Sequence, residues 1–146
     1  NKEKEERENK ITGEIAEDIV LKSEIRRLQQ QGFSEESKKV KQISIDNSNA
    51  GYDIISFLGK AENLEIPDKF IEVKGTTTNS FRFFWSKNEI EVAQELKENY
   101  WIYFVTNIDK DKKTGEIKEI IKDPFSKIFF KDEFKRKCQS YEITKN

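Results

Sequence analysis

The sequence predicts a single α/β domain in which a mixed β-sheet is flanked by helices. A helical segment follows Thr12, several short runs of strand character come next, and a second helix precedes the apolar run Tyr100–Thr106. The chain has 146 residues, which is the usual size of one domain. Helices packed on a mixed sheet fit this order of elements.

Residues 1–10 are expected to form a charged N-terminal arm, and residues 11–146 the domain itself. Asn1–Lys10 is almost free of apolar side chains, which is typical of a solvated arm or the frayed start of a helix. Thr12 is a good N-cap for a helix, and acids follow in its first turns. Gly32 would end this helix near Gln31.

The remaining elements are expected as alternating strands and helices. Turn-forming residues, including Pro67-Asp68, separate the first strands, and Ser86 begins the second helix, which reaches about Glu98. A charged turn at Asp109–Gly115 separates the last two strands. The expected strands are Lys39–Ile45, Gly51–Phe57, Phe70–Gly75, Tyr100–Thr106 and Glu116–Ile121, followed by a short helix near Asp132–Cys138 and a terminal extended piece.

Missing residue types exclude several kinds of chemistry. The chain has no His, which excludes a Ser-His-Asp triad, a Cys-His pair and a His-ligated metal. Its one thiol, Cys138, permits neither an internal disulfide nor a Cys-rich zinc site, so the expected location is the reducing cytoplasm. No apolar stretch approaches the ~20 residues of a membrane span. The lack of Met indicates a fragment of a longer protein.

Two acids stand where apolar side chains are expected. At about 100° per residue, Glu17 falls in the middle of the apolar side of the first helix, where an ionised carboxylate needs a partner. Asp is depleted in strands, yet Asp53 shares a face with Ile55 and Phe57. The alternatives are that Glu17 lies at the rim of the stripe, and that Asp53 closes the preceding turn through its own hydrogen bonds.

Glu72 and Lys74 are expected side by side on one strand. Side chains alternate along a strand, so Ile71 and Val73 take one face, and Glu72 and Lys74 the other, with Cα atoms about 6–7 Å apart. Other Glu-x-Lys pairs in the chain read as solvated salt pairs. The pair at Glu72 combines a strong strand with the upstream Asp53.

Asp53, Glu72 and Lys74 on adjacent strands suggest a magnesium site. Two carboxylates and a backbone carbonyl, here that of Val73, can hold Mg²⁺, with Mn²⁺ as a substitute, while several waters stay in place. The metal would make a bound water more acidic and offset charge on a phosphodiester. Lys74 could orient the nucleophile, and Glu17 could support the metal's outer shell. A His-free protein could cleave DNA in this way.

These residues resemble a known group of nucleases. Asp53 followed by Glu72-Val73-Lys74 resembles the PD-(D/E)xK superfamily, which has the restriction-endonuclease-like fold. More closely, the chain resembles the domain family named for the C-terminus of the protein NO VEIN. The matching segments are Gly13-x-x-Ala16-Glu17-x-x-Val20, Gly51-Tyr52-Asp53-Ile54, Ile71-Glu72-Val73-Lys74-Gly75, Phe84-x-Ser86-x-Asn88-Glu89 and Tyr100-x-x-Tyr103-x-Val105. One departure is that Gly51-Tyr52 replaces the Pro that usually precedes the first acid.

The resemblance implies a core of helix, three-stranded meander, helix and strand. It implies that Asp53, Glu72 and Lys74 line a metal site and that Glu17 is the helical carboxylate. It also implies a fused or associated helicase, ATPase or DNA-modification module in a bacterial restriction or defence system. Cleavage of both DNA strands would need two sites, which a homodimer could provide.

Several further residues are candidates for substrate contact, each with a plainer explanation. Thr76, Arg82 and Lys87 could grip phosphates, or could belong to an ordinary polar loop. Ser86 and Asn88 could face substrate, although Ser86-x-x-Glu89 is also a capping box. The run Phe81–Trp85 could stack on bases, or could be core. Gln94 reads as helix filler, and Cys138 shows no sign of reactivity.

The function expected from these observations is a Mg²⁺-dependent DNA endonuclease that uses metal-activated water. The alternative is a catalytically inactive nuclease-like domain that serves as a nucleic-acid or protein interaction module. The net charge of −1 favours this alternative slightly, because a nuclease needs a positive surface somewhere. A glycosidase that uses a carboxylate pair has the right residue types but no supporting motif.

Overall fold

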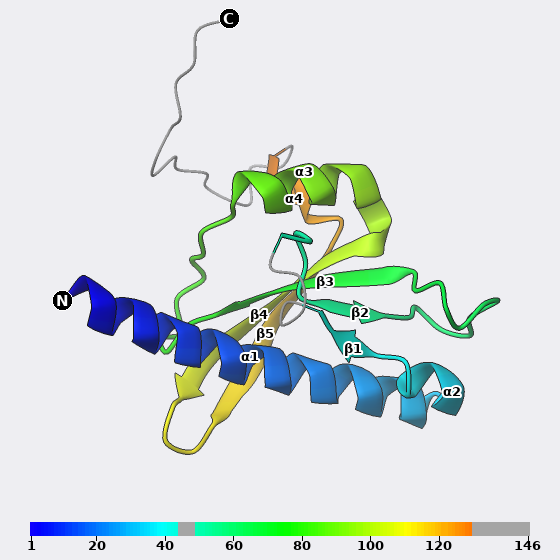
Figure 1. Cartoon of the computed structure of the whole chain (residues 1–146), viewed down its shortest axis with the longest axis horizontal. Coiled ribbons are helices and arrows are strands. Elements are labelled where there is room, and N and C mark those ends of the chain that lie inside the picture. The colour runs from blue at the N-terminus through cyan, green and yellow to red at the C-terminus, as the bar shows by residue number, and fades with distance from the viewer. Residues whose placement is uncertain (44–48, 130–146) are drawn as a thin grey trace, which may run out of the picture.

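A mixed sheet between two helical layers forms the described part of the chain, residues 1–43 and 49–129 of a computed structural model (Figure 1). Helix α1 covers one face of the sheet, and helices α3 and α4 cover the other. No helix in these residues is both long enough and apolar enough to span a membrane. The elements are α1 (Lys2–Gln30), α2 (Ser34–Ser37), β1 (Lys41–Gln42), β2 (Ile54–Ser56), β3 (Lys69–Gly75), α3 (Lys87–Leu96), a 3-10 turn (Lys97–Asn99), β4 (Tyr100–Asp109), β5 (Thr114–Lys122) and α4 (Pro124–Phe129).

The strands lie in the order β1-β2-β3-β4-β5. The first three pair antiparallel as a meander, β3 and β4 pair in parallel, and β5 returns antiparallel to β4. A parallel pair needs a crossover connection, and α3 lies in the segment that links β3 to β4. The expected α/β class and the order of helix, meander, helix and strand are confirmed.

Helix α1 begins at Lys2, so the expected start at Thr12 is wrong. Of the two forms expected for residues 1–10, a solvated arm or the start of a helix, the structure shows the start of a helix, and all ten residues are exposed. They are mostly Lys, Glu and Arg, which are good helix formers, and neither Gly nor Pro interrupts them. Asn1 caps the helix by accepting from the Glu3 N–H at 2.8 Å, and Thr12 donates its hydroxyl to the Glu8 carbonyl at 2.9 Å.

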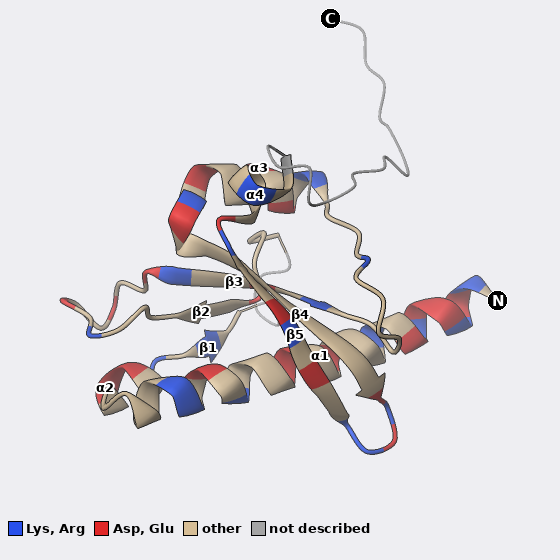
Figure 2. Ribbon diagram, turned by 180° about the vertical axis from the view of Figure 1, so that it is seen from behind, with Lys and Arg blue, Asp and Glu red and all other residues tan. Residues whose placement is uncertain are grey.

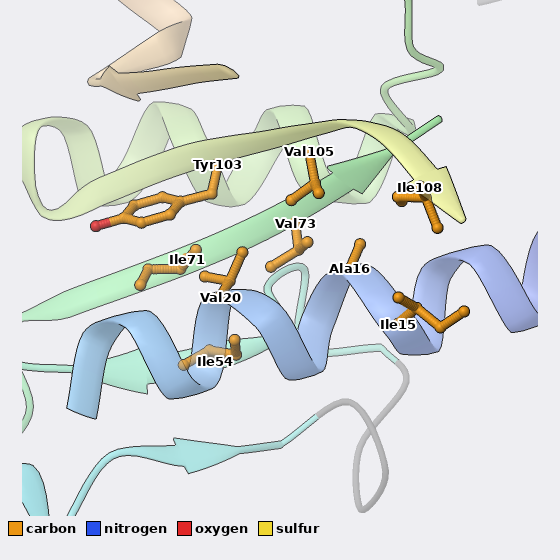
Figure 3. Close-up of a cluster of buried hydrophobic side chains, with 9 residues drawn as sticks. All are labelled: Ile15, Ala16, Val20, Ile54, Ile71, Val73, Tyr103, Val105 and Ile108. Atoms are coloured by element: carbon orange, nitrogen blue, oxygen red, sulfur yellow. The ribbon is translucent and has the colours of Figure 1, made fainter. Parts of the chain in front are cut away.

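The buried side of α1 follows a regular four-residue spacing. Thr12, Ala16, Val20, Glu24 and Leu28 are buried on it, and spacing by four places them on one side of a helix. Figure 3 shows apolar members of this row and Ile15 facing side chains from β2, β3 and β4. The buried acid of this helix is therefore Glu24, whereas the sequence had drawn attention to Glu17.

Gly75 lets α1 lie close to the end of β3. A Cβ at this position would come within 2.9 Å of both the Ala16 Cβ and the Ile108 Cδ1. Such distances are too short for carbon atoms, so a larger residue would push the helix away from the sheet. The small residues Ala16 and Gly75 thus set the distance between α1 and the strand that carries Glu72 and Lys74.

Other boundaries differ modestly from expectation. Strand β1 covers Lys41–Gln42 of the expected Lys39–Ile45, and residues 44–48 lie outside the described part. Helix α4 was not expected from the sequence. The helix expected near Asp132–Cys138 and the terminal extended piece also lie outside the described residues.

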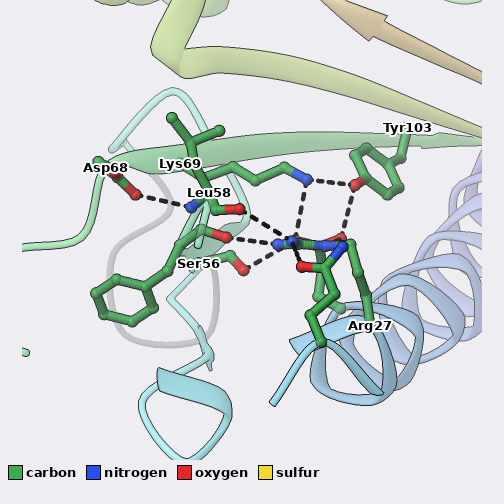
Figure 4. Close-up of polar contacts among 9 residues, drawn as sticks. Arg27, Ser56, Leu58, Asp68, Lys69 and Tyr103 are labelled. Atoms are coloured by element: carbon green, nitrogen blue, oxygen red, sulfur yellow. Dashed lines mark hydrogen bonds and ion pairs between the residues drawn. The ribbon is translucent and has the colours of Figure 1, made fainter. Parts of the chain in front are cut away.

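A buried polar cluster joins α1 to the sheet on the α1 face (Figure 4). Glu24, only 1% exposed, accepts from Arg27 at 2.9 Å, from Ser56 at 2.8 Å and from Tyr103 at 2.7 Å. Lys69 Nζ lies 3.1 Å from Glu24 Oε1 and donates to the Tyr103 hydroxyl at 2.6 Å. Burial alone would raise the pKa of Glu24, but Arg27 and Lys69 hold it below its ordinary value. The buried acid is therefore fully partnered.

Replacing Glu24 by Gln should lower the free energy of unfolding by about 3–5 kcal/mol, because Lys69 and Arg27 would lose the buried carboxylate that pairs with both of them. Urea denaturation monitored by circular dichroism would measure the change. The control is Glu35→Gln, which removes an exposed ion pair with Lys38 and should cost less than about 0.5 kcal/mol.

The same measurement has a pH dependence with a definite sign. Because the pKa of Glu24 is lowered in the folded state, its stabilising effect is present above its ordinary pKa near 4.5 and disappears as the pH falls through the folded-state value. The stability difference between the parent and Glu24→Gln should therefore shrink in acid. An equal difference at pH 7 and pH 3 would contradict an ionised, partnered Glu24.

Candidate metal and phosphodiester site

Asp53 and Glu72 meet because β2 and β3 are paired. The Asp53 N–H donates to the Ile71 carbonyl at 2.8 Å, which extends the pairing of Ile54 with Ile71 by one residue. Ile54 and Ile71 face α1, so their neighbours Asp53 and Glu72 face the other side of the sheet. The Asp53 Oδ2 also accepts from the Val73 N–H at 2.8 Å, which holds the carboxylate against β3.

Lys74 lies on the same face as Glu72, as predicted. Its Nζ is 3.4 Å from Glu72 Oε2 and 2.7 Å from Glu89 Oε1, and the side chain is 14% exposed. Burial alone would lower the pKa of Lys74, but the two carboxylates raise it above its ordinary value. The ammonium is therefore charged and fixed between β3 and α3.

Glu89 has two roles, of which sequence reasoning emphasised one. Ser86 and Glu89 form the expected capping box, in which the Ser86 Oγ accepts from the Glu89 N–H and the Glu89 Oε1 accepts from the Ser86 N–H at 3.2 Å. The same Oε1 atom accepts from Lys74. The first turn of α3 thus positions Lys74. The capping motif, combined with the crossover from β3, was the signal that could have indicated this second role.

The loop before Asp53 is held by groups from α3 and β4. Gly51 has φ +84°, and a Cβ there would lie 2.6 Å from Val92 Cγ2, so glycine is required by both conformation and space. Tyr100 donates its hydroxyl to the Gly51 carbonyl at 2.7 Å, and Asn88 donates to the Asn49 carbonyl at 2.9 Å.

These contacts enclose a pocket of about 190 Å³ around the two acids. Its lining residues come from the loop before β2, from β3 and from the start of α3: Asn49, Gly51, Tyr52, Asp53, Glu72, Ser86, Asn88 and Glu89. A pocket of this size is small for a drug-like ligand. It could hold an ion with its waters, or one phosphate group.

The acids in this pocket are strongly coupled. Burial, together with the nearby charge of Glu17, raises the pKa of Asp53 to about 6. Burial and the charge of Asp53 raise the pKa of Glu72 well above its ordinary value. The Glu72 carboxyl donates a hydrogen bond to Asp53, so the pair retains a proton at a pH where ordinary carboxyls have lost theirs.

The donor set fits a hard divalent cation in kind. Asp53 and Glu72 offer carboxylate oxygens only, which are ligands that Mg²⁺ prefers. Among the residues that the structure describes, no group of three or more His, Cys, Asp or Glu side chains is arranged to hold a metal ion. Mg²⁺ usually takes only one or two protein carboxylates and completes its shell with waters and substrate phosphates, so a two-acid set is compatible with it.

Glu17 lies near this centre without lining the pocket. It comes from α1, accepts from Gln42 Nε2 at 2.9 Å, and is half-buried. Its charge contributes to the raised pKa of Asp53, which places its carboxylate within electrostatic reach. The structure therefore places Glu17, the third predicted acid, near the pocket but outside its lining.

The other predicted contact residues divide into two groups. Ser86 and Asn88 line the pocket, whereas Thr76, Arg82 and Lys87 do not. The Thr76 N–H donates to the Val105 carbonyl at 2.9 Å, and Arg82 and Lys87 are exposed. Gln94 is exposed on α3, and Cys138 lies outside the described residues.

Comparison with known proteins gives one family. The family model described as "Protein NO VEIN, C-terminal" matches residues 16–120, which is most of the chain. The chain belongs to this family. The NO VEIN C-terminal match includes Glu17, the pocket acids Asp53 and Glu72, and both Lys74 and Glu89. Searches of curated proteins and of solved structures each found no match.

Replacing Asp53 by Asn should stabilise the metal-free NO VEIN C-terminal domain increasingly as the pH rises. Folding raises the pKa of Asp53 from 3.8 to about 6, so its ionisation costs the folded state stability over that interval. The stability difference between the variant and the parent should grow by about 1–3 kcal/mol between pH 4 and pH 8. Denaturation in a chelating buffer would measure it.

The matched control is Asp18→Asn, which changes an exposed acid on α1 that pairs with Lys22. Its stability difference from the parent should show no comparable growth with pH. A pH-independent difference for Asp53→Asn would mean that burial and the charge of Glu17 do not raise the pKa of Asp53 in the folded domain.

Proposed function

We propose that this domain is a Mg²⁺-dependent nuclease that hydrolyses phosphodiester bonds in DNA. The observation that carries the proposal is the meeting of Asp53 and Glu72 in one pocket, with Lys74 two residues along the same face of β3. Membership of the NO VEIN C-terminal family is compatible with the proposal and does not itself specify an activity.

The charges around the pocket support a divalent cation. Asp53, Glu72 and Glu89 carry three potential negative charges against the single positive charge of Lys74. Burial is the main cause of the raised pKa values of Asp53 and Glu72, and neighbouring carboxylates raise them further: Glu17 for Asp53, and Asp53 and Glu89 for Glu72. Glu24, by contrast, is buried among cations and has a lowered pKa. A bound cation would relieve the repulsion between the pocket acids and displace their shared proton.

Each residue then has a role that follows from its position. Asp53 and Glu72 would hold the metal. The backbone carbonyl of Val73, the residue between Glu72 and Lys74, could add a ligand. Bound Mg²⁺ supplies Lewis-acid stabilisation of phosphoryl charge and makes a coordinated water more acidic. Lys74 would place a positive charge beside the scissile phosphate, with Glu89 positioning it, and Asn88 could donate to a phosphate oxygen at the rim.

The wider setting belongs to the same proposal. Under this proposal, the domain is one part of a cytoplasmic bacterial restriction or defence protein. A helicase, ATPase or DNA-modification module would be fused to it or associated with it. The rival function is a binding module that has kept the fold and lost the chemistry. Metal binding and cleavage separate these two functions.

Mg²⁺ or Mn²⁺ should bind to the parent protein and not to the double variant Asp53→Asn with Glu72→Gln, because the variant has lost both carboxylates. Isothermal titration calorimetry measures this directly. The control double variant, Asp18→Asn with Glu35→Gln, removes two exposed acids and should bind metal as the parent does. If both double variants bound metal as tightly as each other, the metal site would not be in this pocket.

Lys74→Ala should reduce cleavage of DNA by at least about 100-fold, since it removes the charge held beside the pocket. The measurement is single-turnover cleavage of labelled DNA with Mg²⁺, alongside circular dichroism to confirm folding. Lys38→Ala, at an exposed site just after α2, is the matched control. DNA binding by the parent without any metal binding or cleavage would favour the interaction module.

A further inference from the structure

In the segment between β3 and α3, Phe84 is the most exposed aromatic ring, whereas its neighbours Phe83 and Trp85 are half-buried. Phe83 and Trp85 pack into the core on the α3 face, where Phe83 lies 6.0 Å from Phe104 and 6.3 Å from Trp85 between ring centroids. Phe84, between them, is 65% exposed. The half-buried rings on either side pack against the core, so the exposed ring is carried on an anchored segment.

This exposed ring is close to the pocket along the chain. Ser86, which lines the pocket, is two residues further on, and two residues span at most about 7 Å between Cα atoms. On the other side, the Phe83 ring centroid lies 5.9 Å from Lys74 Nζ. Phe84 therefore stands within roughly one nucleotide's reach of the group that the proposed function places beside the scissile phosphate.

A positively charged side chain lies beside Phe84. Arg82 lies over the ring, with its Cζ 5.7 Å from the centroid. No Asp or Glu occurs between Glu72 and Glu89, in a chain with 28 acids. Figure 2 shows this segment with blue and no red, in contrast to the mixed charges of α1. The segment itself therefore contributes positive charge and no negative charge.

We propose that Phe84 and Arg82 form a platform for an unpaired base of single-stranded DNA next to the pocket. This inference rests on the proposed nuclease function and specifies the form of its substrate. An exposed aromatic ring beside a cation is the arrangement with which proteins bind single strands, since bases stack on the ring while the cation attracts the backbone. In duplex DNA the base faces are already covered by neighbouring bases, so they are not available to Phe84.

Exposure alone does not carry this proposal, because single exposed apolar residues are common on protein surfaces. Ile66 shows the difference. It is equally exposed at 65%, but it lies on the connection between β2 and β3 and is not among the residues that line the pocket. Phe84 combines exposure with an anchored backbone, an adjacent guanidinium and a short path to the pocket.

Fluorescence anisotropy of a labelled oligothymidylate would test the platform, with Ca²⁺ replacing Mg²⁺ in the buffer. Phe84→Ala should weaken single-strand binding about tenfold, and Phe84→Trp should retain it because the larger ring still stacks. Ile66→Ala is the matched control and should bind as the parent does. The corresponding duplex should bind more weakly to the parent and respond little to Phe84→Ala.

Photocrosslinking gives a second readout that does not depend on affinity. An oligonucleotide that carries 5-iododeoxyuridine should form an adduct in the tryptic peptide Phe83–Lys87, which mass spectrometry would identify. The adduct should be lost in Phe84→Ala, in which Phe83 and Trp85 remain. Unchanged affinity of Phe84→Ala for the single strand, or an adduct that persists in it, would overturn the proposal.

The remaining outcomes distinguish this inference from the proposed nuclease function. If the parent binds metal and cleaves duplex DNA but does not bind the oligothymidylate, the platform is wrong and the nuclease proposal stands. If the single strand binds through Phe84 but no metal binds, the nuclease proposal fails while the platform stands as a binding surface. If Phe84→Ala instead changes the sedimentation of the protein alone, the ring is a contact between copies and the platform is overturned.

Discussion

The backbone pairing of Asp53 with β3 is the constraint on which the rest of the site depends. Its N–H donates to Ile71, and its carboxylate accepts from the Val73 N–H. These two hydrogen bonds hold the Asp53 carboxylate beside Glu72. The cost is a pair of partly desolvated acids, and the structure offsets it with the ammonium of Lys74. Helix α3 is placed so that its first turn supports that ammonium.

Strand β3 carries buried charge on both of its faces, with opposite results. On the α1 face, Lys69 and Arg27 together outnumber the single acid Glu24, which stays ionised at a lowered pKa. On the α3 face, the acids outnumber the base and hold a proton. The first cluster is satisfied by its own side chains and acts as structure. The negative charge of the second cluster, on the α3 face, is balanced only when a proton or a cation is bound. This is why the proposed chemistry is assigned to that cluster.

Features that depend on local sequence were predictable. Alternation along Phe70–Gly75 correctly placed Glu72 and Lys74 on one face, and Ser86 correctly marked the start of α3. The burial of Glu24 was not predictable, because its partners Lys69 and Tyr103 come from distant strands. Its spacing on α1 resembled that of any apolar position in the stripe.

The early start of α1 was missed for a different reason. A charged segment such as residues 1–10 has strong helical propensity, but nothing in it reveals whether the following helix will extend backwards through it. The convergence of Asp53, Glu72 and Lys74 was predictable from the motif, while the electrostatic state of these groups required the burial and distances that only the fold supplies.

A single oxygen atom, Glu89 Oε1, accepts from both the Ser86 N–H and Lys74 Nζ. The end of a helix and the position of a site lysine are therefore one cooperative unit. Helix ends fray more readily than helix centres, and fraying here would release the lysine at the same moment. Conversely, any phosphate that binds Lys74 and so holds it in place would favour the folded first turn of α3. Local helix–coil equilibrium and ligand occupancy are thus thermodynamically linked in this domain, without any movement of the sheet.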